Sequence, residues 1–341
     1  MVIRYKGKDT DLPKIARELG VDAIMSGRLV QRGDNLTISV ELVDVRNNKL
    51  LWGEQYERKM SELLATQREI ASEITQNLRL KLSGEGEKAL TKRYTDNNEA
   101  YQLYLQGRFH YAKRTKDDML RAIEYFQQAI KLDPNFALAY VGVSESYGLM
   151  PSYAYLSPKE AYPQAKAAAQ RALTIDPSLA EAHAALATTF TLYDWNWVSA
   201  ESEYEQAIEL NPNVAETHYR YGLSYLIPMG RTDEGIREIK RALELEPLSI
   251  AMSANLAGAF MYARQNDLAL KQAQETYNLE PSHITARVWL GYIYDSQGMY
   301  TRKQLLSVKS PCKPTRTIWT LFLLPDTPTR KWAGDRRPRR F

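Results

Sequence analysis

The chain has 341 residues, of which 44% are hydrophobic and 25% are charged, and its formal net charge is +4. This length predicts two or three domains, and the hydrophobic share is large enough for a substantial core. No unbroken apolar run approaches the roughly 18 to 20 residues of a membrane-spanning helix, residues 1–11 show no signal-peptide segment, and the single Cys312 excludes an internal disulfide.

Positive charge is concentrated at the carboxy-terminal end. Residues 301–341 contain eleven Lys and Arg against two Asp, a net charge of +9, so residues 1–300 sum to −5, which is 4 minus 9. Nucleic-acid binding normally shows basic residues along a helix face or interleaved aromatics, and neither pattern precedes residue 301. We therefore expect no nucleic-acid binding through the earlier part of the chain.

The first 82 residues predict a small α/β domain. Partly alternating apolar runs joined by Arg32, Gly33, Asp34 and Asn35 indicate a hairpin, because Gly and Asx residues favour tight turns. An apolar series at helical spacing follows the third run. The predicted elements are a helix over residues 11–19, strands over 23–30, 36–43 and 50–56, and a helix over 60–82.

This order, together with the residues LGVDAIMSGRLVQRGDNLTISVELVDVRNNKLLWGEQYER, resembles the amino-terminal domain of TolB and related FlgO-like domains over about residues 3–82. In that family another strand and helix come first, and the residues printed here do not supply them. The resemblance therefore implies an incomplete α/β domain. A sheet that lacks a strand exposes an unpaired edge and part of its apolar face.

Beyond residue 97, helical phrases of nearly equal length each end on a proline. Successive prolines are 43, 35, 35 and 34 residues apart, a period typical of stacked helix pairs. The longer first interval fits an enlarged turn at residues 150–160, where Pro151 and Pro158 interrupt the helix. That turn is either a tolerated loop insertion or a functional protrusion. The phrase-ending prolines are Pro134, Pro177, Pro212, Pro247 and Pro281.

The same side-chain sizes recur at the same distance from each proline. Small residues let two helices approach closely, and rings fill the gap between one pair and the next. Five places before the prolines stand Ala129, Ala172, Ala207, Ala242 and Thr276. Twelve places before stand Ala122, Ala165, Ala200, Gly235 and Ala269. Ten places after stand Ser144, Ala187, Gly222, Ala257 and Gly291, and thirteen after stand Tyr147, Phe190, Tyr225, Phe260 and Tyr294.

This pattern resembles the tetratricopeptide repeat over residues 97–300. The clearest copy, residues 214–247, carries Tyr221, Gly222 and Tyr225 in its first helix and Gly235 in its second. The resemblance implies a mainly α protein, a right-handed α-solenoid of five repeats and a sixth first helix behind the small incomplete α/β domain. It also implies a protein-binding scaffold whose partner is a protein or peptide.

The remaining segments are a linker at residues 83–96 and an irregular basic tail at 301–341. The tail combines five prolines with arginines, so no stacked helix is expected there. It is either translated out of frame, with more repeats in the neighbouring frame, or a basic tail that contacts anionic lipid or nucleic acid.

We expect recognition along the inner face of the solenoid, which is lined by the first helix of each pair. Ala184 and Thr188 stand where a basic clamp for carboxyl tails would carry Lys and Asn, so an apolar or amphipathic peptide fits better. Tyr219, Leu226, Met261 and Tyr292 are the expected anchors. The predicted inward residues are Glu181, Thr188, Thr191, Glu216, Tyr219, Leu223, Leu226, Met261, Val288, Tyr292 and Asp295.

No catalytic, cofactor or metal site is expected. The kinase motifs and a complete phosphate-binding loop are absent from the sequence, and the acidic pairs lie on solvated helices. His183 and His218 share one repeat phase, which predicts a shared packing role, with metal binding as the minor alternative. Trp195 and Trp197 are expected to clamp the elbow of a helix pair, or else to stack on a ligand.

Two functions stay open at this point. The first is a free-standing adaptor that brings proteins together. The second is the sensory or regulatory carboxy-terminal half of a bacterial signalling protein, because a TolB-like domain followed by these repeats resembles such proteins, whose effector is a Ser/Thr kinase, a cyclase or a winged-helix domain. The compartment and the oligomeric state are open as well.

Overall fold

The computed structural model describes residues 21–47, 49–59 and 94–296, together with residues 16, 62, 65, 66, 69, 70 and 73. Residues 83–93 of the predicted linker, most of the two helices predicted beside the sheet, and the tail at 301–341 therefore lie outside the described residues. Two units divide the chain, residues 1–114 with 120–142 and residues 115–119 with 143–341. Each unit is treated by itself below.

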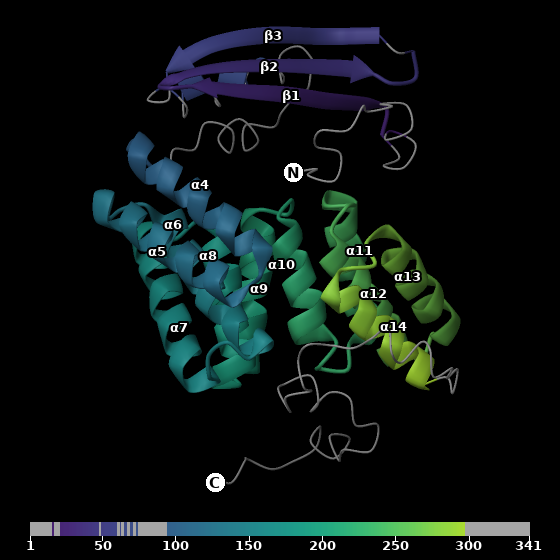
Figure 1. Cartoon of the computed structure of the whole chain (residues 1–341). Helices are drawn as coiled ribbons and strands as arrows, with labels where there is room; N and C mark the ends of the chain where they lie inside the picture. Colours follow the sequence, from purple (N-terminus) through teal and green to yellow (C-terminus); the bar gives the residue numbers. More distant parts are fainter. Residues whose placement is uncertain are drawn as a thin grey trace. The chain divides into compact units, whose positions relative to one another are not determined.

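The three predicted strands form one antiparallel sheet in the order β1-β2-β3, shown at the top of Figure 1. A two-residue turn joins the first hairpin, and Gly33 takes a φ of 62° there, which a glycine adopts without strain. A bulge between Leu42 and Val43 interrupts the second pairing. The strands are β1 (Ala23–Arg32), β2 (Asn35–Asp44) and β3 (Lys49–Lys59).

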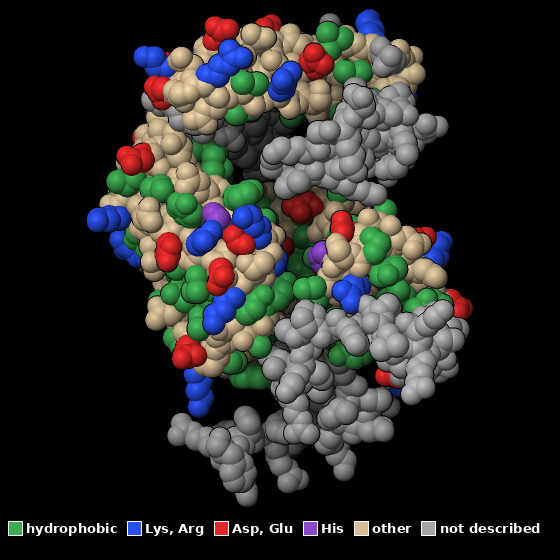
Figure 2. All heavy atoms as spheres, viewed as in Figure 1, with side chains coloured by type: hydrophobic (Ala, Val, Ile, Leu, Met, Phe, Trp, Pro, Cys, Tyr) green, Lys and Arg blue, Asp and Glu red, His purple; other side chains and the backbone are tan. Residues whose placement is uncertain are grey.

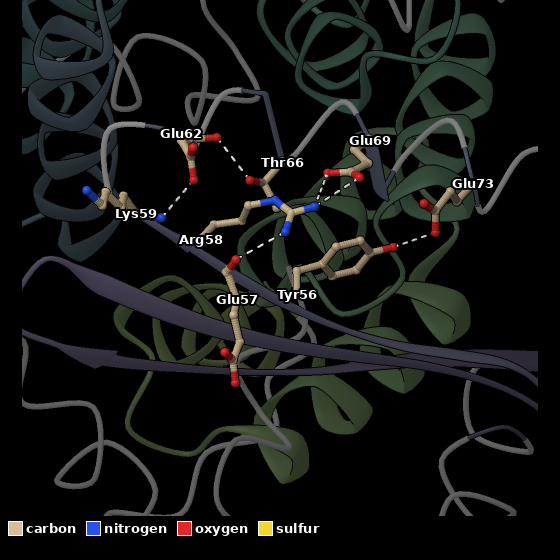
Figure 3. A network of polar contacts seen from close by, with 8 residues as sticks. All are labelled: Tyr56, Glu57, Arg58, Lys59, Glu62, Thr66, Glu69 and Glu73. Atoms are coloured by element: carbon tan, nitrogen blue, oxygen red, sulfur yellow. Dashed lines mark hydrogen bonds and ion pairs between the residues drawn. The ribbon is translucent and has the colours of Figure 1, made fainter.

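One face of this sheet is apolar because the hydrophobic residues of β2 and β3 alternate with polar ones. Its buried members are Leu36, Val40, Leu42, Trp52 and Tyr56, each at most 9% exposed. A segment of residues 62–73 is tied to β3 by polar contacts, which Figure 3 shows from close by. The contacts join Tyr56 to Glu73, Arg58 to Glu69 and the Lys59 backbone N–H to Glu62 at 2.6, 3.0 and 3.0 Å.

The helical part of the chain begins with α4 (Asn98–Lys113), α5 (Lys116–Leu132) and α6 (Ala137–Leu149). Asn97 caps α4 by accepting a hydrogen bond from the Ala100 N–H at 3.0 Å. The fully buried Phe126 ring fills the space that two glycines leave open. A Cβ atom would lie 2.5 Å from this ring at Gly107 and 2.7 Å at Gly142, so neither position admits a larger residue without displacing the ring.

The second unit continues the pairs, and each helix packs on the next along the chain (Figure 1). This confirms the mainly α solenoid of helix pairs predicted from the proline period. α8 and α10 extend into the π-helical turns η4 (Phe190–Asp194) and η5 (Tyr221–Leu226). The helices are α7 (Pro158–Ile175), α8 (Ala180–Thr189), α9 (Trp197–Leu210), α10 (Ala215–Arg220), α11 (Thr232–Leu245), α12 (Ile250–Tyr262), α13 (Asn266–Leu279) and α14 (Ile284–Ser296).

The enlarged turn contains the 3-10 turn η3 (Met150–Tyr153) and ends where α7 begins. A capping box starts that helix, because the Glu160 N–H donates to the Ser157 hydroxyl and the Ser157 N–H donates to the Glu160 carboxylate. Within the described part of the chain, no helix is long and apolar enough to cross a membrane.

The predicted indole clamp is correct for Trp197 and wrong for Trp195. Trp197 packs on the cluster that contains Tyr225, with ring centroids 6.2 Å apart. Trp195 is 57% exposed, and its backbone has a φ of 54°. In this left-handed conformation Trp195 ends the π-helical turn, and most of its indole is left in solvent.

Candidate protein-binding groove

Three successive first helices of the second unit enclose one pocket, which we call the α6–α8–α10 pocket. Its walls are made by small residues where the helices come closest, among them Gly148, Ala184 and Ala185. Because these side chains leave space that larger ones would fill, a small, shallow pocket remains between the helices and opens to solvent. The other lining residues are Ser144, Glu145, Glu181, Thr188, Thr189, Val214, Glu216, Thr217 and Arg220.

Acidic residues outnumber basic ones around this pocket. Glu145, Glu181 and Glu216 face a single guanidinium, Arg220, which contacts Glu216 at 2.7 Å. The pocket therefore has an excess of negative charge. Elsewhere on the face drawn in Figure 2, Lys and Arg side chains are interspersed with Asp and Glu.

Two buried hydroxyl groups in the pocket wall lack a hydrogen-bond partner among the described residues. They are Ser144 Oγ and Thr217 Oγ1, and their side chains belong to residues 2% and 1% exposed. Leaving a buried hydroxyl unpaired is unfavourable, and neither oxygen has appreciable exposed surface through which a ligand in the pocket could reach it. Thr188 differs, because its hydroxyl donates to the Ala184 carbonyl at 2.9 Å and lies 3.1 Å from the Tyr204 hydroxyl.

The structure brings only part of the predicted groove into this pocket, namely Glu181, Thr188 and Glu216. Thr191, Leu223 and Leu226 are 1%, 7% and 1% exposed, so little of their surface is open to a ligand. Leu226 in particular packs in a core cluster because the π-helical turn η5 carries it inward. The remaining predicted residues lie on α10, α12 and α14 outside the pocket, and are Tyr219, Met261, Val288, Tyr292 and Asp295.

A buried polar network links three of these first helices. The Asn255 amide donates to the Tyr219 hydroxyl at 2.8 Å, and the Trp289 indole N–H donates to the Asn255 carbonyl oxygen at 2.8 Å. Asn255 is 6% exposed. The network uses both ends of the Asn255 amide inside the protein and holds the Tyr219 hydroxyl in place.

His183 and His218 share a packing role, as their common phase predicted. In each, Nδ1 lies 2.6 Å from a glutamate of the following helix, Glu203 or Glu238, and Nε2 lies 2.9 Å from the carbonyl oxygen of the repeat-ending proline. Both oxygens are acceptors, so the geometry favours the doubly protonated ring. The glutamate hydrogen bond raises the pKa of both histidines above 6.5, against the opposing effect of burial.

The next repeat makes the same connection with neutral groups. Ser253 Oγ lies 2.6 Å from Thr276 Oγ1 and accepts from the Gln272 amide at 2.8 Å. Gln272 occupies the phase of Glu203 and Glu238, nine places before its proline. Among the residues that the structure describes, no group of three His, Cys, Asp or Glu side chains is placed to hold a metal ion.

Sequence reasoning missed Ser144, Glu145, Thr217 and Arg220 as pocket residues. Glu145 lies eleven places after Pro134, an inward phase, so the repeat alignment points to it. Arg220 lies four places after Glu216, which is the spacing of a helical ion pair. Ser144 stands at the close-contact phase ten places after Pro134, which indicated helix packing and not a pocket, and Thr217 gives no signal of its own in the sequence.

Comparison with known proteins finds a match to one family model over a short segment and several distant relatives. Residues 111–136 match the tetratricopeptide repeat family model. The putative adenylate cyclase 3 of Rhizobium meliloti strain 1021 is 29% identical over 140 residues, 41% of this chain and 24% of that protein. The transcriptional regulator HilA of Salmonella typhimurium strain LT2 is 24% identical over 270 residues, 78% of this chain and 47% of that protein. The chain thus spans less than half the length of these curated relatives.

Solved structures show the same helical fold. Human IFIT1, solved as a dimer with m7Gppp-AAAA, superposes with a TM-score of 0.53 at 16% identity, over 70% of this chain and 53% of that one. TTC0263, a thermophilic tetratricopeptide protein of Thermus thermophilus, gives a TM-score of 0.47 at 19% identity, over 57% and 98% of the two chains. Together with the family-model match at residues 111–136 and the stacked helix pairs, the IFIT1 superposition shows that the helical part of the chain has a tetratricopeptide-type α-solenoid fold, which is typical of protein-interaction scaffolds.

Proposed function

We propose that the chain is a protein-interaction scaffold that holds a segment of a partner protein along the inner faces of α8, α10, α12 and α14, with the α6–α8–α10 pocket as its main contact. The observation that carries the proposal is the acidic lining of the pocket, where Glu145, Glu181 and Glu216 stand beside Arg220.

The charge of the pocket favours a basic residue in that segment. Three carboxylates line the pocket together with Ala184 and other small residues. A lysine side chain suits this combination, because its methylene stem packs on apolar walls while its ammonium group donates hydrogen bonds to carboxylates. Beyond the pocket, the half-buried Tyr219 and Met261 and the 38% exposed Tyr292 offer apolar surface to the same segment.

Selection from a phage-displayed random peptide library against the whole chain tests this proposal. Peptides that bind the wild type should be enriched in Lys or Arg flanked by apolar residues. Glu181→Arg should weaken their binding at least about tenfold, since it replaces attraction by like-charge repulsion in a partly enclosed site. Glu209→Arg is the matched control, because Glu209 is exposed on α9 outside the pocket. Equal loss of binding in both variants, or in neither, would contradict the proposal.

A second function rests on the relatives. The matches to a putative adenylate cyclase and to a transcriptional regulator cover 24% and 47% of those proteins, so in both the aligned part accompanies a larger remainder. We propose as the alternative that this chain is the regulatory half of a signalling protein whose effector is a cyclase, a kinase or a winged-helix domain. Sequencing the DNA upstream of the reading frame tests it, and an isolated gene would support the free adaptor instead.

A further inference from the structure

One edge of β1 faces away from β2. In the described sheet β1 pairs only with β2, so its other edge meets no described strand. The Asp22 carbonyl accepts from the Val45 N–H at 3.0 Å, on the β2 side. Because backbone groups alternate in direction along a strand, the N–H and C=O groups of the odd-numbered residues from Ala23 to Gln31 point to the outer edge.

The apolar face of the sheet is covered on β2 and β3 but not on β1. Ile70 packs on the covered cluster of Val40, Leu42, Trp52 and Tyr56. Met25 and Leu29 lie on the same face, in register with Leu42 and Ile38, yet they are 55% and 57% exposed. The exposed apolar residues thus lie directly beside the open edge.

We propose that this edge pairs with β1 of a second copy of the chain, antiparallel and about a two-fold axis at Gly27, which joins the two sheets into one. An isologous contact needs a strand that is complementary to itself. With Gly27 opposite Gly27 of the second copy, Met25 meets Leu29, Ile24 meets Val30, Ser26 meets Arg28, and Asp22 meets Arg32. Ile24, Met25, Leu29 and Val30 then each face an apolar residue, Ala23 faces Gln31, and each end carries an opposite-charge pair.

Other registers lack this complementarity. A slide of one residue would place the apolar face of one sheet against the polar face of the other. A slide of two residues in one direction puts Ile24 opposite Arg28 and Asp22 opposite Val30. In the other direction it puts Arg28 opposite Arg28 and Met25 opposite Gln31. Only the register centred on Gly27 keeps both the apolar and the charged pairs.

The edge also lacks the features by which proteins commonly prevent such pairing. β1 contains neither proline nor lysine and runs for 10 residues. Its two arginines do not block the pairing, because Arg28 meets Ser26 and Arg32 meets Asp22 of the second copy.

Cysteine cross-linking of the full-length chain tests the register. In a Cys312→Ser background, Gly27→Cys places two thiols across the axis, on Cα atoms about 5.5 Å apart, within the range of a disulfide. The substitution fits the fold, because a Cβ at Gly27 comes no nearer than 3.7 Å to the Ser39 carbonyl oxygen. Gln31→Cys is the matched control in the same strand, since the proposed register separates its two copies by about 27 Å.

We expect rapid formation of a covalent dimer by Gly27→Cys under mild oxidation and little by Gln31→Cys. Sedimentation of the unmodified chain should show a dimer, and Leu29→Lys, at an exposed position, should raise its dissociation constant at least about tenfold. Equal cross-linking of the two cysteine variants, a folded chain that sediments as a monomer, or a dimer that Leu29→Lys leaves unchanged would overturn the proposal.

Discussion

Gly222 sits where the first and second helices of one repeat come closest, and its replacement by alanine tests the close-packing argument. A Cβ at Gly222 would lie 2.6 Å from the carbonyl oxygen of Gly235 in α11. The reciprocal Cβ at Gly235 would lie 2.9 Å from the Gly222 carbonyl oxygen. Both obstacles are backbone atoms, so relief requires the two helices to separate.

The size of the effect follows from two opposing contributions. Alanine favours helix over glycine by about 1 kcal/mol. Against this, the new contact is 0.8 Å shorter than the 3.4 Å at which ordinary contact begins, and overpacking of this kind costs about 1–3 kcal/mol. We expect the overpacking to outweigh the helix propensity, so that Gly222→Ala lowers the free energy of unfolding by up to about 2 kcal/mol.

Gly148→Ala is the control, because its Cβ would meet nothing nearer than the Ala165 Cβ at 4.0 Å. This variant should be neutral or up to about 1 kcal/mol more stable. Urea unfolding followed by circular dichroism measures both variants. If Gly222→Ala proved as stable as Gly148→Ala, the close approach of the helix pair would be contradicted.

Further variants address other parts of the protein. The pKa values of His183 and His218 are raised in the folded protein, so their contribution to stability is complete below about pH 6.5 and is lost as the pH rises through the folded-state pKa. In the double His→Gln variant, the unfolding midpoint should therefore depend less on pH over that range. Phe126→Ala should cost about 3–5 kcal/mol in thermal or urea unfolding, because it empties the space beside Gly107 and Gly142. Ser157→Ala should cost about 1 kcal/mol through loss of the α7 cap, and an effect near zero would show that the cap is dispensable. Tyr219→Ala and Met261→Ala should each weaken capture of the selected peptides, and unchanged capture would remove them as anchors.

The repeat pattern predicted most of the fold because the same helix–helix contact recurs at the same position of each repeat. Ala129, Ala172, Ala207, Ala242 and Thr276 are all fully buried, as their shared distance from the prolines indicated. The three strands were equally predictable from the sequence, since a turn at Gly33 and alternating apolar residues indicate a hairpin.

The groove was harder to predict than the fold. Counting along an ideal helix assigns Leu226 to the inner face, but the π-helical turn η5 adds residues to one turn and carries Leu226 into the core. Periodicity alone does not reveal where a π-helical turn occurs. Burial of the Trp195 indole was predicted wrongly for a related reason. Trp195 has a left-handed backbone conformation and is largely exposed, and hydrophobicity alone does not indicate that conformation.

Photo-cross-linking tests the central claim, that a partner segment lies in the α6–α8–α10 pocket, most directly. A benzophenone amino acid replaces Glu181 at the half-buried wall of the pocket in one variant and the exposed Glu209 of α9 in another. Irradiation with a labelled, library-selected peptide should join it to position 181 and not to position 209. Equal labelling at both positions, or labelling at 209 alone, would show that the partner binds elsewhere.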